Sequence, residues 1–271
     1  MAATMAVPFS GSEAPTIRND NFGRPLTHSS IRAETDGYLC EAAKLDLLTA
    51  TAYSYRGAAK SNSGDQVGAI ADCRHAIELD PKNANAYRAR AHTRASQGDY
   101  TGAIADLDQA IQLDPLCADA YRLRGEIKDR LGDFEGALAA YLQSIRFAND
   151  DAAYSRFWVC LIGLRLHRGK PQQDLAAAIA DWKDGWPRTV GRFLVGKLTE
   201  TDFMALAGQA DPKIANEQQC EACYYAGMLR HLQSDDAGAR YLFQRCMATG
   251  VDIFSEFGFA RTELGRLDTK P

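Results

Sequence analysis

Two cysteines, Cys220 and Cys223, stand at a spacing that metal sites and redox pairs use. A zinc site of this kind needs a second pair of Cys or His ligands, and His231 stands alone after them. The other histidines form no sequence cluster with an acid and a nucleophile: His28, His75, His92 and His167. The sequence also lacks a phosphate-cradling glycine-rich loop and the G-x-S-x-G and H-E-x-x-H motifs. We therefore expect no enzymatic activity, no cofactor and no metal, and we keep a thiol or metal protein only as an alternative.

Three arginines recur at intervals of 34 residues: Arg56, Arg90 and Arg124. They could form a track for an anion. However, Asp72 and Asp106 follow the first two at a constant offset, which favours charge-assisted hydrogen bonds within the fold. Ala140 stands at the same offset in the third unit, so Arg124 is expected to be freer. We therefore predict that the arginines are structural.

The interval of 34 residues also holds for four other residue types. These are Tyr53, Tyr87 and Tyr121; Gly64, Gly98 and Gly132, each followed by an aspartate; and Ala69, Ala103 and Ala137. Glycine suits the left-handed end of a helix, and the aspartate after it can cap the next helix. The first two units close with Asp-Pro, at Pro81 and Pro115, which stops a helix. Each unit is therefore expected to be a pair of helices joined by a tight turn.

These offsets resemble the tetratricopeptide repeat (TPR), whose middle copy here carries Tyr87, Ala91, Gly98, Ala103 and Pro115. The resemblance implies an all-α, TPR-type helical solenoid of stacked antiparallel helix pairs. The predicted helix pairs are 50–62 with 66–79, 84–96 with 100–113, and 118–130 with 134–148. Stacking is what buries the apolar stripe of each pair.

The remaining chain is predicted to extend the array in weaker form. An apolar helical period gives a leading helix at 36–48, a degenerate pair after residue 151, and a short helix capped by Thr199. The motif returns over 220–248, where Cys220 and Cys223 occupy helical repeat positions, and 254–267 forms a closing helix. The predicted organisation is thus an extended or disordered segment (1–33), a leading helix with three repeats (34–149), a degenerate region (150–219), and a last repeat with its closing helix (220–271).

Five stretches are similar to the NlpI family of bacterial TPR lipoproteins: 155–158, 186–187, 190–196, 220–227 and 257–264. The resemblance implies an adaptor, often dimeric, that binds proteases and cell-wall enzymes in the envelope. That family begins with a lipoprotein signal and an acylated cysteine, and this sequence shows neither. We expect a cytoplasmic protein if Met1 is the native start, and the periplasm or cell envelope if a signal sequence was removed.

A TPR solenoid exposes an inner surface that other proteins can bind. Nine residues are predicted to line it: Thr51, Ser54, Asn85, Arg88, His92, Asp119, Arg122, Glu126 and Asp129. The alternative is a merely solvated helix face. The residues where chaperone-binding TPRs carry a carboxylate clamp are Ser54, Ala58, Ala89, Asp119 and Leu123, so no clamp is expected.

The overall composition narrows the choice of partner. A net charge of −4 argues against a nucleic-acid partner, and no apolar run reaches the roughly 20 residues of a membrane span. We predict a non-catalytic scaffold that binds a protein or peptide. The alternative is a self-associating subunit, a possible homodimer, that uses apolar array ends at Phe254, Phe257 and Phe259 or at Tyr38 and Leu39.

Overall fold

The computed structural model describes residues 49–148, 152–209, 212–251 and 255–269, and every regular element within these ranges is a helix. Three antiparallel pairs come first. They are α2 (Ala50–Asn62) with α3 (Gln66–Leu79), α4 (Ala84–Ser96) with α5 (Tyr100–Leu113), and α6 (Ala118–Arg130) with α7 (Phe134–Phe147). The helices begin and end within one residue of the sequence prediction. The predicted segments 1–33 and 36–48 lie outside the described residues.

The turns within these pairs follow the predicted chemistry. Gly64, Gly98 and Gly132 have φ angles of 88°, 83° and 82°, a left-handed conformation that glycine adopts without a steric cost. The aspartate after each glycine accepts a hydrogen bond of 2.9 Å from the amide three residues on, as Asp99 does from Gly102. The helix starts are therefore capped by side chains encoded in the repeat itself.

The second half continues with shorter and less regular helices. They are α8 (Ala153–Arg165), α9 (Pro171–Ala178) with the 3-10 turn η1 (Ile179–Asp181), α10 (Trp186–Leu194) and α11 (Glu200–Gly208). The last three are α12 (Pro212–Leu232), α13 (Asp236–Ala248) and α14 (Ser255–Asp268). Helix α12 starts eight residues before the predicted repeat at 220, because Pro212 can open a helix.

The two halves of the chain have different hydrophobic cores. In the repeats, small residues such as Ala91, Ala103 and Ala110 are buried, which lets neighbouring helices approach closely. In the second half the core is aromatic, with Trp158 of α8 centred 4.4 Å from the Phe259 ring and 5.3 Å from the Tyr224 ring. These contacts pull α8, α12 and α14 into one cluster.

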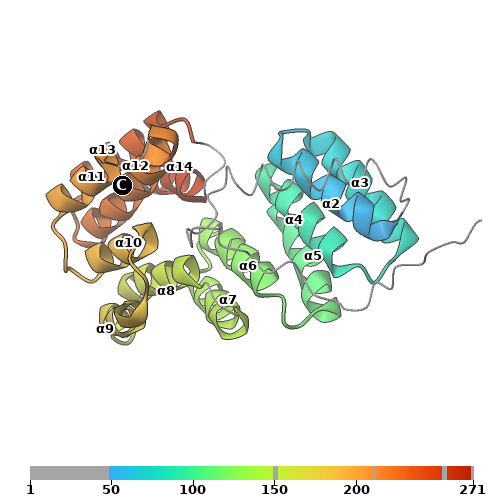
Figure 1. Cartoon of the computed structure of the whole chain (residues 1–271), viewed down its shortest axis with the longest axis horizontal. Helices are drawn as coiled ribbons and strands as arrows, with labels where there is room; N and C mark the ends of the chain where they lie inside the picture. The colour runs from blue at the N-terminus through green and yellow to red at the C-terminus, as the bar shows by residue number, and fades with distance from the viewer. Residues whose placement is uncertain (1–48, 149–151, 210–211, 252–254, 270–271) are drawn as a thin grey trace, which may run out of the picture.

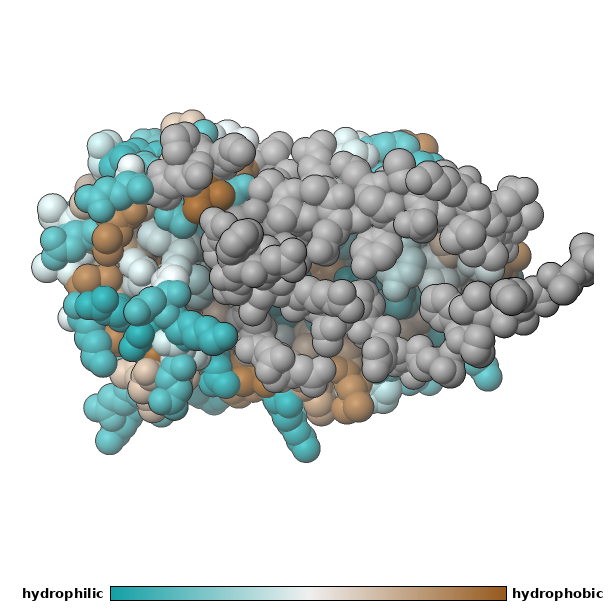
Figure 2. Space-filling view, viewed as in Figure 1, coloured by the Kyte–Doolittle hydropathy of each residue, from teal (hydrophilic) through white to brown (hydrophobic). Residues whose placement is uncertain are grey.

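Figure 1 shows the resulting arrangement. Helices α2 to α5 stack at one end of the molecule, α8 to α14 form the other end, and α6 and α7 lie between them. Hydrophilic and hydrophobic residues are interspersed over the coloured part of the surface seen in Figure 2. Among the described helices, none combines the length and the apolar character required to cross a bilayer.

Candidate functional site

The nine residues predicted to line the inner surface fall into two groups. Six of them keep at least part of their side chain accessible: Thr51, Asn85, Arg88, His92, Asp119 and Arg122. Ser54, Glu126 and Asp129 are buried, with exposed fractions of 2%, 7% and 5%. The Ser54 hydroxyl donates a 2.8 Å hydrogen bond to the carbonyl oxygen of Thr51. The other two are covered by a distant part of the chain.

Helix α14 is the element that covers Glu126 and Asp129. The Ser255 hydroxyl donates to Oε2 of Glu126 at 3.3 Å. Arg266 donates to the carbonyl oxygen of Asp129, and its guanidinium lies 3.6 Å from the Asp129 carboxylate. Glu126 and Asp129 therefore do not line an open groove, which corrects the sequence prediction. The physical reason is that the solenoid turns far enough for its last helix to contact α6 (Figure 1).

Charged and aromatic side chains fix α14 on this surface. Glu263 accepts hydrogen bonds from Arg165 of α8, at 2.9 Å, and from Arg266. The guanidinium of Arg130 on α6 lies 4.8 Å from the centre of the Phe259 ring. Arg165 and Arg266 both stack over Phe134, at 4.6 and 5.0 Å. These α14 residues occupy the surface that the sequence assigned to a ligand.

The buried carboxyl groups under α14 have shifted pKa values. Burial raises the pKa of Asp129 to about 6, although Arg165 and Arg266 oppose the shift. For Glu263 burial also acts to raise the pKa, but the same two guanidinium groups outweigh it, and its pKa lies below the ordinary value. The covered half of the surface is thus a compensated network of charges rather than an apolar interface.

A second buried acidic group lies beside this network. Burial raises the pKa of Glu256 to about 7, and its carboxyl accepts a 2.9 Å hydrogen bond from Tyr225. Burial, followed by the charge of Glu256, raises the pKa of Glu221 well above its usual range. The Glu221 carboxyl accepts from the Tyr154 hydroxyl at 3.1 Å and from the Trp186 indole at 3.0 Å. Sequence analysis did not single out these acids, because their hydrogen-bond partners lie on three separate helices, α8, α10 and α12.

The open half of the surface lies over α2, α4 and the first turns of α6; we call it the open groove. Arg122 pairs with Asp119 at 3.5 Å and with Glu126 on its own helix. Arg88 has only a 3.5 Å contact with the Asn85 carboxamide, and no carboxylate of the described residues lies within ion-pair distance of it. Burial acts to raise the pKa of Asp119, but Arg122 and Arg88 together bring it below the usual value. The charges of α4 and α6 therefore act on one another.

The equally spaced arginines are structural, as the sequence predicted. Arg56 binds Asp72 through two hydrogen bonds of 2.7 Å, and Arg90 binds Asp106 at 2.9 and 2.7 Å. Each of the three guanidinium groups also lies over the tyrosine three residues earlier. Arg124 pairs instead with Asp108 at 2.9 Å, and its Nε is buried without an acceptor. Sequence analysis missed two further ion pairs, which join Lys60 to Asp72 and Arg94 to Asp106.

The cysteine pair is also part of the core. Cys220 and Cys223 are buried, and the Cys220 sulfur lies 3.3 Å from the sulfur of Cys246 on α13. Burial raises the pKa of Cys223 to about 11, which keeps its thiol protonated. Within the described ranges, no group of three or more His, Cys, Asp or Glu side chains is placed to hold a metal ion. The helical positions of the cysteines account for their burial.

Comparison with known proteins agrees with this architecture. Residues 88–153 match the family model of the tetratricopeptide repeat. Similar solved structures include a tetratricopeptide repeat protein from Parabacteroides merdae, with 14% identity, a TM-score of 0.52, and coverage of 90% of this chain and 94% of that chain. YrrB, described as a TPR protein with an unusual peptide-binding site, shares 15% identity, with a TM-score of 0.44 and coverage of 82% and 97%.

MamA shares 17% identity, with a TM-score of 0.42 and coverage of 74% of this chain and 91% of that chain. No curated protein matches the sequence. At these identities the Parabacteroides structure supports the fold alone, and the family match is confined to residues 88–153. With three regular helix pairs, their capped turns and the matched stretch in agreement, the chain has an all-α, TPR-type helical solenoid fold.

Proposed function

We propose that this protein is a non-catalytic adaptor that holds an extended segment of another protein in the open groove. The TPR fold suggests a protein–protein interaction scaffold, and TPR proteins are generally non-catalytic. The observation that carries the proposal is the contrast between the two halves of the inner surface. The protein's own α14 covers the half over α6 and α8, whereas Asn85, Arg88 and Asp119 remain accessible in the other half.

The side chains of the open groove suggest what the partner carries. Arg88 has no carboxylate partner among the described residues, so an acidic side chain of the partner can pair with it. The Asn85 carboxamide can donate to and accept from a peptide backbone. Asp119 offers a complementary site for a basic residue, close to Arg122. The groove is therefore suited to a segment of mixed charge in extended form.

The test compares two substitutions of equal chemistry. Arg88→Glu reverses the charge in the groove, whereas Arg74→Glu reverses an exposed arginine on α3 that makes no ion pair or side-chain hydrogen bond with any residue that the structure describes. We expect partners recovered with the wild type to be recovered equally with Arg74→Glu and at least about tenfold less with Arg88→Glu, since misplaced like charges cost several kcal/mol. Equal recovery with both variants would remove the open groove from the proposal.

Placing a photocrosslinking amino acid at each site makes the test more direct. A crosslinker at Asn85 is expected to capture a partner that a crosslinker at Arg74 does not capture.

The resemblance to the NlpI family extends the proposal to an envelope partner and a homodimer. Phe257 and Phe259 pack within the chain, and Phe254, Tyr38 and Leu39 lie outside the described residues. Light scattering over a range of protein concentrations tests self-association independently of the groove.

A further inference from the structure

Helix α12 is longer than the first helix of a regular repeat. It has 21 residues, whereas α2, α4 and α6 have 13 each, so the excess is eight residues. The part of α12 from Cys220 onward packs against α13, where the Cys220 sulfur lies 3.3 Å from the Cys246 sulfur. Residues 212–219 therefore extend past the end of α13 by about two helical turns, or roughly 12 Å. We call this part of α12 the overhang.

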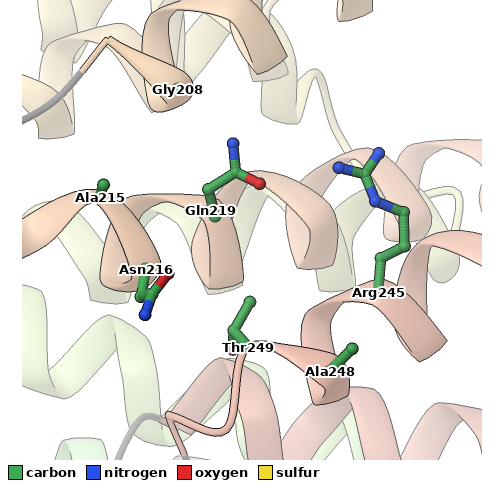
Figure 3. A pocket seen from close by; sticks show the side chains of 7 residues that line it. All are labelled: Gly208, Ala215, Asn216, Gln219, Arg245, Ala248 and Thr249. Carbon is green, nitrogen blue, oxygen red and sulfur yellow. The ribbon is translucent and has the colours of Figure 1, made fainter. Parts of the chain in front are cut away.

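A pocket lies between the overhang, the end of α11 and the end of α13 (Figure 3). It is a shallow pocket, largely open to solvent, with a volume of about 400 Å³. The lining residues are Gly208, Ala215, Asn216, Gln219, Arg245, Ala248 and Thr249. Three of them are Gly or Ala, so their backbones leave room for a ligand to approach closely.

The two carboxamides and the guanidinium that line the pocket make no hydrogen bond or ion pair with the described residues, and Asn216 and Arg245 are exposed. Figure 3 shows the Gln219 carboxamide at the centre, between Asn216 on one side and the Arg245 guanidinium on the other. Neither carboxamide forms a side-chain hydrogen bond there. The guanidinium of Arg245 forms no ion pair there either, and its one aromatic contact is with the Tyr241 ring, at 5.8 Å. The pocket thus presents one cation and two carboxamides to solvent.

The end of α13 does not neutralise this cation. The hydroxyl of Thr249 donates to the carbonyl oxygen of Cys246 at 2.7 Å, and the amide of Gly250 donates to that of Met247 at 3.2 Å. These last carbonyls are therefore satisfied by the local chain. The donors of Arg245 remain available for a ligand that carries negative charge.

We propose that the overhang pocket binds a small organic acid. A carboxylate matches the paired N–H donors of Arg245, which form strong charge-assisted hydrogen bonds in this geometry. The carboxamides of Asn216 and Gln219 bind a second polar group of the same molecule, because each can both donate and accept. The site is separate from the open groove and does not depend on the proposed function.

The experiment is a titration of the full-length protein followed by NMR. Succinate is the probe, and its uncharged diamide, succinamide, is the comparison at constant ionic strength. We expect saturable shifts of the Asn216 and Gln219 side-chain amide signals and of the Arg245 Nε–H signal with succinate. Succinamide, which lacks the charge, is expected to bind at least tenfold more weakly.

Two variants and one control complete the test. Arg245→Gln is expected to weaken succinate binding at least tenfold, and Ala248→Leu is expected to do the same by filling the pocket while leaving its polar groups in place. Arg192→Gln changes an exposed arginine outside the pocket that makes no ion pair with the described part of the chain, and this variant should bind succinate as the wild type does. Shifts that do not saturate, equal binding of succinamide, or unchanged binding by Arg245→Gln would overturn the proposal.

Discussion

The carboxylate of Glu263 on α14 lies 2.9 Å from the guanidinium of Arg165 on α8, so one ion pair joins residues 98 positions apart in the chain. The Glu263 side chain is 2% exposed and the Arg165 side chain 15%. Because both charges are largely removed from water, neither can lose its partner without a large cost. This pair holds the last helix against the inner surface and thereby sets the limit of the open groove.

Substitution of Glu263 is expected to destabilise the protein strongly. Glu263→Gln keeps the shape but leaves Arg165 and Arg266 without their shared carboxylate, so we expect a loss of about 3 kcal/mol in the free energy of unfolding. Urea denaturation measures this change. Glu135→Gln breaks the exposed pair with Arg168 and should cost less than about 1 kcal/mol. Equal effects of the two variants would contradict a buried network under α14.

The stability of the protein should fall between about pH 4.5 and pH 7 through the contribution of Glu256. Its pKa is raised to about 7 in the folded state from an ordinary value of 4.5, so the folded state retains a proton that the unfolded state has lost. Folded protein therefore binds more protons in this window, and the contribution, of order 3 kcal/mol, is present at low pH and lost as the pH rises through 7.

Glu256→Gln isolates this contribution. Its neutral side chain keeps an acceptor for Tyr225, and the facing residues Glu126, Arg122 and Glu221 stay in place. We expect the difference in unfolding free energy between pH 5 and pH 7.5, measured in urea, to change by about 3 kcal/mol relative to the wild type. Glu135→Gln should leave the pH dependence as it is. No change in Glu256→Gln would refute the assignment.

Two aspartates on α5 provide a matched test of the repeat ion pairs. Asp106 is buried and binds both Arg90 and Arg94, whereas the Asp108 side chain is 57% exposed and binds Arg124. Asp106→Ala is expected to cost about 3 kcal/mol and Asp108→Ala less than about 1 kcal/mol, because the Asp106 carboxylate is buried and shared by two guanidinium groups, whereas the Asp108 carboxylate is exposed to water. Thermal and urea unfolding would show the difference. A large effect at Asp108 with none at Asp106 would reverse our assignment.

Two helical glycines should respond to alanine in opposite directions. A Cβ atom at Gly227 of α12 would lie 2.7 Å from the ring of Phe243, whereas one at Gly265 of α14 would have no atom within 4 Å. Gly227→Ala is therefore expected to cost about 1–3 kcal/mol through overpacking. Gly265→Ala should add about 0.5–1 kcal/mol, because alanine favours the helix. Melting curves of both variants would test the close approach of α12 and α13.

Much of the first half could be predicted from the sequence, because its determinants are local and repeated. The glycine at each turn, the aspartate after it and the paired arginine and aspartate all recur at fixed offsets, and Arg90 with Asp106 is an example. The second half was less predictable. Residues 212–219 had no repeat pattern, so the early start of α12 and the pocket beside it were missed. Glu221 and Glu256 were missed because their hydrogen-bond donors lie on other helices.

The helix pairs, their caps and the all-α class follow from the amino-acid pattern, since each depends on contacts within one or two repeats. Which inner-surface residues remain accessible depends on contacts between distant parts of the chain. Ser255 meets Glu126 across 129 positions, and Arg266 meets Asp129 across 137. Such contacts depend on the rotation accumulated over every intervening helix, and small changes in each helix packing angle add up along a solenoid. For that reason the residue pattern of α6 could not show that its own chain covers it.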